Sequence, residues 1–301
     1  MPDEAPGGTR TDAGQGGGPE RRFGIAQAVA DDGEVVATMP SGPHLAGPAG
    51  LPPGGALGVL IDNSLGLAMI LSRPASLWSV SAQISLDLCR TLPSDGSPII
   101  ARARNVHASP HAGFAMGTVT DQAGRLLATC RQHGRWVTTM PPGGPVLAGQ
   151  PQGTWPGPEP AQPQAGGPAG GSRAPAADLA ALLGARVQLT EGGARLELDV
   201  TGDVTNPLGN LHGGVTFAAC DVVAQAAIAA AGGPVATASI HVAYPRPVAA
   251  GTTPRFDARV IHRGRVLGVV EVRVTVDGDR PCVIATVTTG VPEPGATAPG
   301  T

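Results

Sequence analysis

A histidine, two glycines and an aspartate in the second half of the chain have types and spacing that could do chemistry. His212, Gly213 and Gly214 stand at the start of an apolar stretch, and Asp221 follows nine residues after the histidine. A glycine pair is unfavourable in a helix, but it leaves the first backbone N–H groups open to a ligand. Those amides and the positive end of the helix dipole could stabilise negative charge developing on a carbonyl oxygen. Tight packing of the helix start against a neighbouring backbone is the alternative explanation for the glycines.

The aspartate is unusual because an acid in an apolar stripe costs free energy unless a partner or a reaction uses it. Asp221 lies among Ala, Val, Phe and Ile. Its carboxylate could activate water or attack an electrophilic carbonyl carbon. Pairing with an arginine at an interface is the alternative. Burial would raise the pKa of this carboxyl group and nearby N–H donors would lower it, so the sequence leaves the direction open.

The same pattern occurs a second time, 159 positions earlier in the chain. Three features of the two copies align: Gly54 with Gly213, Asp62 with Asp221, and the strand-like run from Ser81 with the run from Thr237. Each copy reads as two strands, one helix and four strands. Both helices are apolar on nearly all sides, which an antiparallel sheet wrapped around one central helix can bury. We therefore predict an α+β fold of two tandem domains, each an antiparallel sheet wrapped around a long central helix.

Composition divides the chain into five segments. Stretches rich in Gly, Pro and polar residues at both ends and in the middle are typical of disordered tails and linkers. The predicted boundaries are a disordered tail over residues 1–21, an N-terminal domain over 22–140, a Pro/Gly-rich linker over 141–174, a C-terminal domain over 175–293 and a disordered tail over 294–301.

Charge and cysteine usage exclude several classes of function. The formal net charge of -3 gives no basic surface for nucleic acid. The most apolar stretch carries Asp221 and Gln225, so we expect a buried helix and no membrane span. The four cysteines are scattered, and no cluster of Cys and His has metal-ligand spacing, so neither a disulfide framework nor a metal site is expected. Together with the absence of a signal peptide, this predicts a cytoplasmic protein.

The segment NPLGNLHGGVTFAACD, residues 206–221, resembles the hotdog-fold acyl-CoA thioesterases of the phenylacetate-pathway (PaaI-like) type. The resemblance rests on Asn206, on the HGG triplet six residues later and on Asp221. It covers most of residues 180–290, while residues 22–138 match more weakly. It implies hydrolysis of an acyl-CoA thioester to a carboxylic acid and CoA, without a cofactor, because CoA enters only as part of the substrate.

Enzymes of this type build each active site across a dimer interface. The resemblance therefore implies that the tandem acts as its own dimer and forms two unlike sites. The first site would combine residues of both domains: Asn206, His212, Gly213 and Gly214 with Asp62 and Ser81. The second site would combine their counterparts: Gly54 and Gly55 with Asp221 and Thr237.

The roles of these residues follow from the same resemblance. In the first site, the Gly214 amide would be the oxyanion donor and Asp62 the general base or nucleophile. Asn206 would either orient water or the substrate carbonyl, or simply form a turn with the proline after it. His212 would either take part in the chemistry or hold its loop by hydrogen bonds.

The second site departs from the family pattern. Gly47 stands where the asparagine is expected, and Pro53 stands where the histidine is expected. We therefore predict one competent site that uses Asp62 and a degenerate partner site.

Two arginines could contribute to substrate binding. Arg263 and Arg265 stand in a turn between predicted strands, where they could contact the phosphates of CoA, or could simply be solvated. The resemblance also implies that two copies of the chain can pair as a homodimer.

Two alternative functions stay open. GDVTNPLGNLH, residues 202–212, resembles the signature of hotdog enoyl-CoA hydratases, in which Asp203 and His212 would act together on water. Inserted residues and the glycines after the histidine favour the thioesterase. The second alternative is a module that binds acyl-CoA without turnover, because one copy has lost the asparagine and the histidine.

Overall fold

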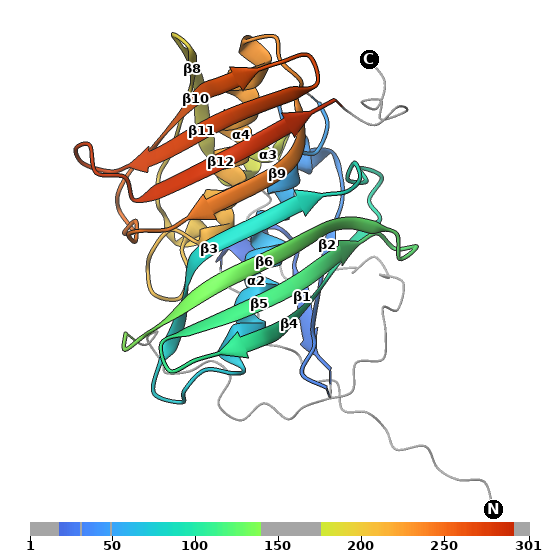
Figure 1. The fold of residues 1–301 in the computed structure, drawn as a ribbon, viewed down its shortest axis with the longest axis vertical. Coiled ribbons are helices and arrows are strands. Elements are labelled where there is room, and N and C mark those ends of the chain that lie inside the picture. Colours follow the sequence, from blue (N-terminus) through green and yellow to red (C-terminus); the bar gives the residue numbers. More distant parts are fainter. Residues whose placement is uncertain (1–17, 31, 49, 140–175, 292–301) are drawn as a thin grey trace, which may run out of the picture.

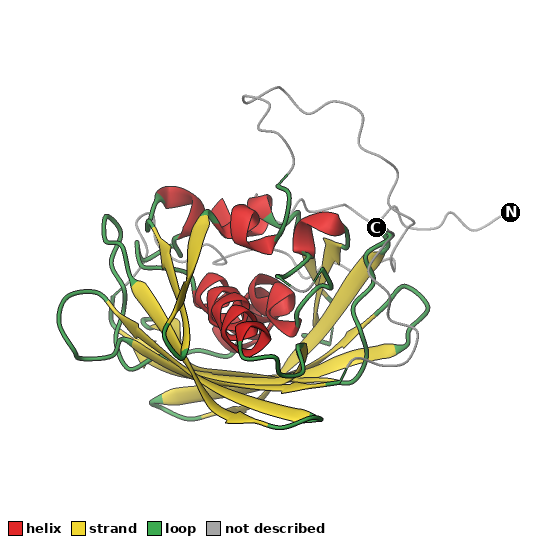
Figure 2. Cartoon of the chain, turned by 90° about the horizontal axis from the view of Figure 1, so that it is seen from above, coloured by secondary structure: helices red, strands yellow, loops and turns green. Residues whose placement is uncertain are grey.

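The structure is a computed structural model that describes residues 18–30, 32–48, 50–139 and 176–291. Its core is one antiparallel sheet that curls around two long helices (Figures 1 and 2). The predicted linker over 141–174 and the predicted tail over 294–301 lie outside the described residues. The predicted α+β fold of two tandem hotdog domains is confirmed.

Both halves have the predicted order of two strands, a long helix and four strands. The N-terminal half contains β1 Ala26–Val29, β2 Val35–Pro40, α2 Gly58–Ile70, β3 Trp78–Leu88, β4 Pro98–Ala108, β5 Ala112–Thr120 and β6 Leu126–Val137. The C-terminal half contains β7 Ala185–Thr190, β8 Gly193–Leu198, α4 Gly213–Ala230, β9 Ala236–Ala243, β10 Arg255–Arg263, β11 Leu267–Thr275 and β12 Val283–Gly290.

The twelve strands form a single sheet in the order β1-β2-β4-β5-β6-β3-β9-β12-β11-β10-β8-β7. Read from either edge inward, the order is the same when each strand is replaced by its counterpart in the other half. The halves are therefore related by an approximate twofold axis between β3 and β9. These two strands pair directly, from Gln83 with Ala243 to Asp87 with Ser239, so the backbone ladder continues across the domain boundary.

The two long helices lie inside the curved sheet and are buried on nearly all sides (Figure 2). α4 is long and apolar enough to cross a membrane by composition, with a mean hydropathy of 1.5, but 83% of it is buried inside the protein. A helix that is apolar all round can be satisfied by a protein core in this way. The predicted burial of both helices is confirmed.

The N-terminal halves of α2 and α4 cross in an antiparallel arrangement at their glycines. Gly55 lies against Asp221 and Gly213 lies against Asp62, while Gly58 meets Gly214 between them. A Cβ atom added to Gly214 would lie 2.4 Å from the Gly58 carbonyl oxygen. Tight backbone packing, the alternative explanation for the glycine pair, is therefore present as well.

Two short helices cover the open side of the helix layer. α1, Gly18–Arg22, packs on the 3₁₀ helix Gly202–Val204 of the C-terminal half, and α3, Leu179–Leu183, packs on the 3₁₀ helix Pro43–Leu45 of the N-terminal half. The predicted disordered tail over 1–21 is therefore wrong for residues 18–21. Glu20 in this segment is buried against the other half of the molecule, where composition alone gave no sign of a partner.

Candidate active site

Asp62 is held by groups from both domains. It lies on α2, and its Oδ2 accepts a hydrogen bond of 2.7 Å from the Gly214 N–H at the start of α4. Its Oδ1 accepts from the Ser81 hydroxyl on β3 at 2.8 Å. The residue is only 8% exposed. The structure thus brings together the predicted residues Asp62, Ser81 and Gly214 across the domain boundary.

Gln132 on β6 completes this cluster and was missed in the sequence. Its Nε2 donates to Ser81 Oγ at 2.7 Å and to Asp62 Oδ1 at 3.2 Å, while its Oε1 has no hydrogen-bond partner among the described residues. Residues alternate between the two faces of a strand, and this alternation places Gln132 on the buried face with Cys130 and Trp136. A polar residue at an inward position was the signal that could have revealed it.

His212 is the N-cap residue of α4. Its Nδ1 accepts from the Gly214 N–H at 3.0 Å and lies 3.3 Å from Asp62 Oδ2. Its Nε2 lies 3.4 Å from Glu20 Oε1 on α1. The histidine therefore joins the helix start, the catalytic candidate Asp62 and a second acid in one buried group.

Burial and the two acids act in opposite directions on His212. Burial lowers the pKa of the imidazole, but the negative charges of Asp62 and Glu20 outweigh it, so the pKa is raised above the ordinary value of 6.5. Burial likewise raises the pKa of Glu20, but the hydrogen bond and charge of His212 bring it below the ordinary value of 4.5. Glu20 and His212 therefore stabilise each other in their charged forms.

Tyr244, at the end of β9, fixes the backbone of the glycine pair. Its hydroxyl donates to the Gly213 carbonyl oxygen at 2.9 Å, and its own N–H donates to the Ala82 carbonyl oxygen at 2.9 Å. Burial, and then the charge of Asp62, raise the pKa of this phenol well above its ordinary value, so it stays a hydrogen-bond donor. Nothing in the sequence analysis had pointed to this residue.

Asn206 lies in a turn. Its Oδ1 accepts from the N–H groups of Leu208 at 3.0 Å and Asn210 at 3.1 Å. In the described part of the chain, the structure records no hydrogen bond between Asn206 and Asp62. The turn is thus the role that the geometry shows, and a direct part of Asn206 in chemistry stays a prediction.

The second predicted site is also assembled across the domain boundary. Asp221 Oδ2 accepts from the Gly55 N–H at 2.7 Å, and the Thr237 hydroxyl lies 2.9 Å from the same oxygen. Gly54 lies beside Thr237, where an added Cβ would come within 3.1 Å of its Cγ2. The four predicted residues of this site therefore meet as expected.

The electrostatics of Asp221 answer the question that the sequence left open. Asp221 is fully buried, and burial raises the pKa of its carboxyl group to about 6, although hydrogen bonds from Gly55 and Thr237 pull in the other direction. No histidine takes part, because Pro53 precedes this helix start and provides no side-chain cap. Desolvation thus dominates at Asp221.

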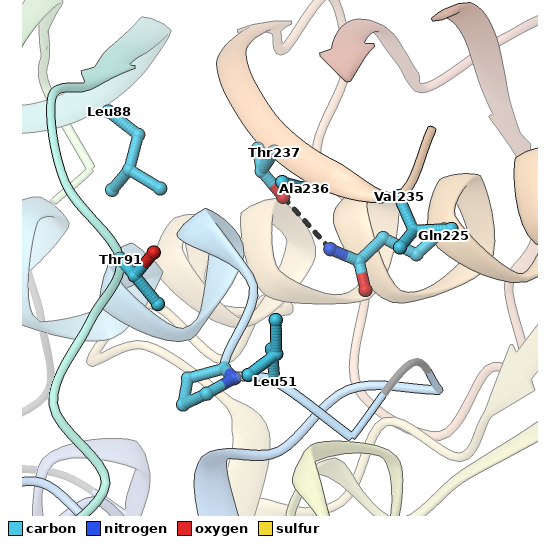
Figure 3. A pocket seen from close by; sticks show the side chains of 8 residues that line it. Leu51, Leu88, Thr91, Gln225, Val235, Ala236 and Thr237 are labelled. Atoms are coloured by element: carbon cyan, nitrogen blue, oxygen red, sulfur yellow. Dashed lines mark hydrogen bonds between the residues drawn. The ribbon is translucent and has the colours of Figure 1, made fainter. Parts of the chain in front are cut away.

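A pocket open to solvent adjoins the Asp221 site (Figure 3). Gln225 and Thr237 form its polar part, and a hydrogen bond of 3.0 Å runs from Gln225 Nε2 to Thr237 Oγ1. The remaining lining residues come from both domains: Leu51, Pro52, Leu88, Thr91, Val235 and Ala236.

The predicted CoA-contacting arginines lie near the other end of α4. Arg263 donates to the Ala231 carbonyl oxygen just after the helix, and Arg265 is exposed in the turn between β10 and β11. An 18-residue helix is about 27 Å long at 1.5 Å per residue, so Arg263 is far from Gly214. Contact of either arginine with CoA stays a prediction.

Asp203 does not support the hydratase alternative. It is exposed in the 3₁₀ helix Gly202–Val204, whereas His212 is buried and oriented toward Asp62 and Glu20. A hydratase that uses both residues on one water molecule needs them to face a common space.

Two family matches cover different halves of the chain. Residues 43–135 match the acyl-CoA thioesterase C-terminal domain, and residues 208–283 match the thioesterase superfamily. Together they account for more than half of the chain and include Asp62, Gly214 and Asp221. No curated protein sequence matches the chain.

Solved structures show the same two-domain fold at low sequence identity. The acyl-CoA thioesterase II TesB2 from Mycobacterium marinum is 10% identical over 93% of this chain and 99% of its own, with a TM-score of 0.55. The tesB protein of Mycobacterium avium subsp. paratuberculosis is 13% identical over 86% of this chain and 92% of its own, with a TM-score of 0.53. The 12:0-ACP thioesterase from Umbellularia californica is 12% identical over 85% of this chain and 93% of its own, with a TM-score of 0.54.

Both halves of the chain thus match thioesterase domains, and the complete chain has the architecture of double-hotdog proteins. The resemblance inferred from the HGG segment is confirmed at the level of fold and family. The chain belongs to the hotdog-fold acyl-CoA thioesterases and carries two such domains in one polypeptide.

Proposed function

We propose that this acyl-CoA thioesterase hydrolyses its substrate at the Asp62 site, the group formed by Asp62, Ser81, Gln132, His212 and Gly214. The observation that carries the proposal is the 2.7 Å hydrogen bond from the Gly214 N–H of one domain to the Asp62 carboxylate of the other. A polarising amide and a carboxylate base are thereby placed at one point, which is what hydrolysis of a thioester requires.

The Gly214 amide acts as the oxyanion donor. In the structure, its N–H donates to Asp62 Oδ2 and also to His212 Nδ1. An entering thioester carbonyl oxygen takes over this donor, and Asp62 keeps its hydrogen bonds from Ser81 and Gln132 through Oδ1. The first N–H groups of α4 and its helix dipole then stabilise the negative charge on the tetrahedral intermediate.

Asp62 acts on the carbonyl carbon as general base or as nucleophile. As general base it takes a proton from water while the water oxygen bonds to the carbonyl carbon. The C–S bond then breaks, and the proton passes to the sulfur of the leaving CoA. As nucleophile it forms an acyl-enzyme anhydride with loss of CoA, and water then hydrolyses the anhydride. Ser81 and Gln132 orient the carboxylate in either route.

His212 and Glu20 act as positioning residues in this scheme. His212 accepts from the Gly214 N–H and lies beside Asp62, while Glu20 lies beside its other ring nitrogen. When neutral, the imidazole fixes the direction of the Gly214 amide through Nδ1; when protonated, it gives up that acceptor and places a positive charge near the carboxylate. This also favours the anion that forms in the transition state.

The test is thiol release from a panel of acyl-CoAs by wild type and by Asp62→Asn. We expect kcat to fall by at least about 10²-fold with little change in KM, because the substitution removes the base but keeps the shape of the side chain. Asp203→Asn, at an exposed position outside the site, is the matched control and should behave as wild type. Full activity of Asp62→Asn on every substrate of the panel would overturn the assignment.

Crotonyl-CoA separates the reaction from that of a hydratase. The proposal predicts loss of the thioester without addition of water to the double bond. Hydration of the double bond that survives Asp62→Asn and is lost in His212→Gln would instead support the hydratase.

A further inference from the structure

The two sites contain the same four kinds of group. In the Asp62 site these are a helix-start N–H, a carboxylate, a hydroxyl and a side-chain amide, from Gly214, Asp62, Ser81 and Gln132. In the Asp221 site, Gly55, Asp221 and Thr237 supply the first three. The fourth comes from Gln225, whose Nε2 donates to the Thr237 hydroxyl at 3.0 Å.

The two amides come from different elements. Gln132 pairs with Ile84 in the sheet, and the corresponding pair in the other half is Val287 with Ile240. The counterpart of Gln132 in the C-terminal half is therefore a valine, Val287. Gln225 lies one turn after Asp221 on α4, and the residue 159 positions earlier is Gly66. Each site thus has one glutamine beside its hydroxyl, on the strand in one case and on the helix in the other.

Gln225 also occupies the place of the missing asparagine. A Cβ atom added to Gly47 would lie 2.8 Å from Gln225 Oε1 and 3.1 Å from Pro53. A side chain at position 47 would therefore displace the Gln225 amide from its present position. The loss of the asparagine, from which degeneracy was predicted, is accompanied by the gain of another amide in the same space.

Gln225 is prepared for a further hydrogen bond. It is only 3% exposed, and its Oε1 has no partner among the described residues. Figure 3 shows this oxygen pointing away from Thr237, and Gln225 is one of the residues that line the pocket. A buried acceptor without a partner is costly unless a ligand or water satisfies it.

We propose that the Asp221 site is a second thioester-hydrolysing site, in which Gln225 on α4 supplies the amide that Gln132 on β6 supplies to the Asp62 site. Its substrate is an acyl thioester whose apolar part lies against Leu51, Pro52, Leu88 and Val235 of the pocket. This inference rests on the proposed function only in that both sites perform the same reaction.

The step balances without any further reactant. Water beside Asp221 forms a C–O bond with the thioester carbonyl carbon while its proton passes to the Asp221 carboxylate, which Thr237 and, through it, Gln225 hold in place. The Gly55 N–H receives the carbonyl oxygen. The C–S bond then breaks, and the proton held by Asp221 passes to the leaving thiolate, so that a carboxylic acid and a thiol are released.

The environment of Asp221 supports this role. Burial raises the pKa of its carboxyl group to about 6, so near neutral pH it is still ionised in most molecules and is a stronger base than an ordinary carboxylate. The residual activity of an Asp62→Asn enzyme should therefore rise with pH through about 6 and then level off.

The experiment compares thiol release from an acyl-CoA panel by wild type, Asp62→Asn, Asp221→Asn and the double variant. We expect Asp62→Asn to retain at least tenfold more activity than the double variant on one or more substrates, with an acyl preference different from that of Asp221→Asn. If Asp62→Asn is as inactive as the double variant on all substrates, the second site does not hydrolyse thioesters and the proposal falls, while the Asp62 assignment stands. If only Asp221→Asn abolishes turnover, the Asp62 assignment falls instead.

Gln225→Leu in the Asp62→Asn background tests the glutamine and leaves the Asp221 carboxylate in place. We expect it to lower the residual activity at least tenfold, with thermal melting as the check of folding. Gln188→Leu, at an exposed position of β7, is the matched control. Equal residual activity of Asp62→Asn/Gln225→Leu and Asp62→Asn/Gln188→Leu would overturn the role of Gln225.

Discussion

The Asp62 site and the Asp221 site share a helix-start amide, a carboxylate and a hydroxyl, but they differ in charge. Asp62 lies beside His212, which in turn lies beside Glu20. The histidine position of the other site is Pro53. When α1 and α3 are aligned on the left-handed glycines that follow them, Gly24 and Gly184, the glutamate corresponds to Ala180. The Asp221 site thus has neither member of the pair.

The joint absence of both residues indicates that Glu20 and His212 form one unit. A buried charge left without its partner is destabilising by several kcal/mol, roughly 3–5. Loss of the histidine alone would leave a buried glutamate, and loss of the glutamate alone would leave a buried histidine with one acid fewer. The comparison also explains why desolvation dominates at Asp221, where no cation opposes it.

The largest expected effect comes from Gly214→Ala. An added Cβ would lie 2.4 Å from the Gly58 carbonyl oxygen and 2.6 Å from the Val59 Cα, so the two helices must move apart and the amide must leave Asp62. Loss of an oxyanion donor lowers kcat by about 10²–10³-fold, and overpacking costs about 1–3 kcal/mol. Thiol release and urea unfolding measure the two effects.

Gly66→Ala is the control for that substitution. Position 66 has no atom within 4 Å of an added Cβ, so the alanine should leave activity unchanged and increase helix stability by about 0.5–1 kcal/mol. A Gly214→Ala enzyme that is as active and stable as Gly66→Ala would refute the packing and the oxyanion role together.

The second prediction concerns stability and pH at the Asp221 site. The folded-state pKa of about 6 lies above the ordinary value of 3.8, so the folded chain holds this proton more tightly than the unfolded chain. The resulting stabilisation is complete below the ordinary value and is lost as pH rises through about 6. Relative to wild type, Asp221→Asn should therefore raise the free energy of unfolding more at pH 8 than at pH 5, by about 1–1.5 kcal/mol.

Urea unfolding at both pH values measures this difference. Asp277→Asn, in the exposed turn between β11 and β12, should show no such dependence. An equal effect of Asp221→Asn at the two pH values would mean that the carboxyl group is not desolvated in the way described.

The third prediction moves the amide from one element to the other. In an Asp221→Asn background, Gln132→Val removes hydrogen bonds to Ser81 and Asp62 and should lower kcat by roughly 10- to 100-fold. Adding Gly66→Gln places a glutamine on the helix, as in the Asp221 site, and should recover part of the loss. Gln83→Val, at an exposed position of β3, is the control. A rescue no better than that of Gly66→Ala would show that the helix position cannot serve this hydroxyl.

The smallest effect is expected from Glu20→Gln. The glutamine oxygen can still accept from His212, so kcat should fall by less than about tenfold. Because Glu20 helps to raise the pKa of His212 above 6.5, the limb of the pH profile due to the imidazole should move to lower pH. The stabilisation from this histidine, complete below 6.5 and lost as pH rises through the folded pKa, should shrink as well. Glu191→Gln, in an exposed turn, should leave the profile in place.

Local patterns were enough to predict the fold of each domain, and together with the family resemblance they predicted four of the five residues of the Asp62 site. The repeat at an offset of 159 aligned Gly54 with Gly213 and Asp62 with Asp221, and the family resemblance then implied that each carboxylate lies at the other helix start. Three expectations stay predictions: the boundaries of the disordered segments that lie outside the described residues, the homodimer and the cytoplasmic location.

The residues that were missed reach their sites only through long-range packing. Gln132 is 70 positions from Asp62, and Glu20 is 192 positions from His212, so no local spacing connects them. Glu20 also stands at the end of a polar, glycine-rich tail that gave no sign of order. Gln225 did carry a signal, because it stands four residues after Asp221 and therefore on the same helix face.

The ladder between β3 and β9 decides how the protein can come apart. Each domain taken alone would present one of these strands as an unpaired edge, a surface prone to pairing with other chains. It would also hold only half of each reaction centre, since every carboxylate and its helix-start amide belong to different domains. Both centres should therefore persist at any dilution of the intact chain, and they should be lost together, in one transition, when the chain unfolds.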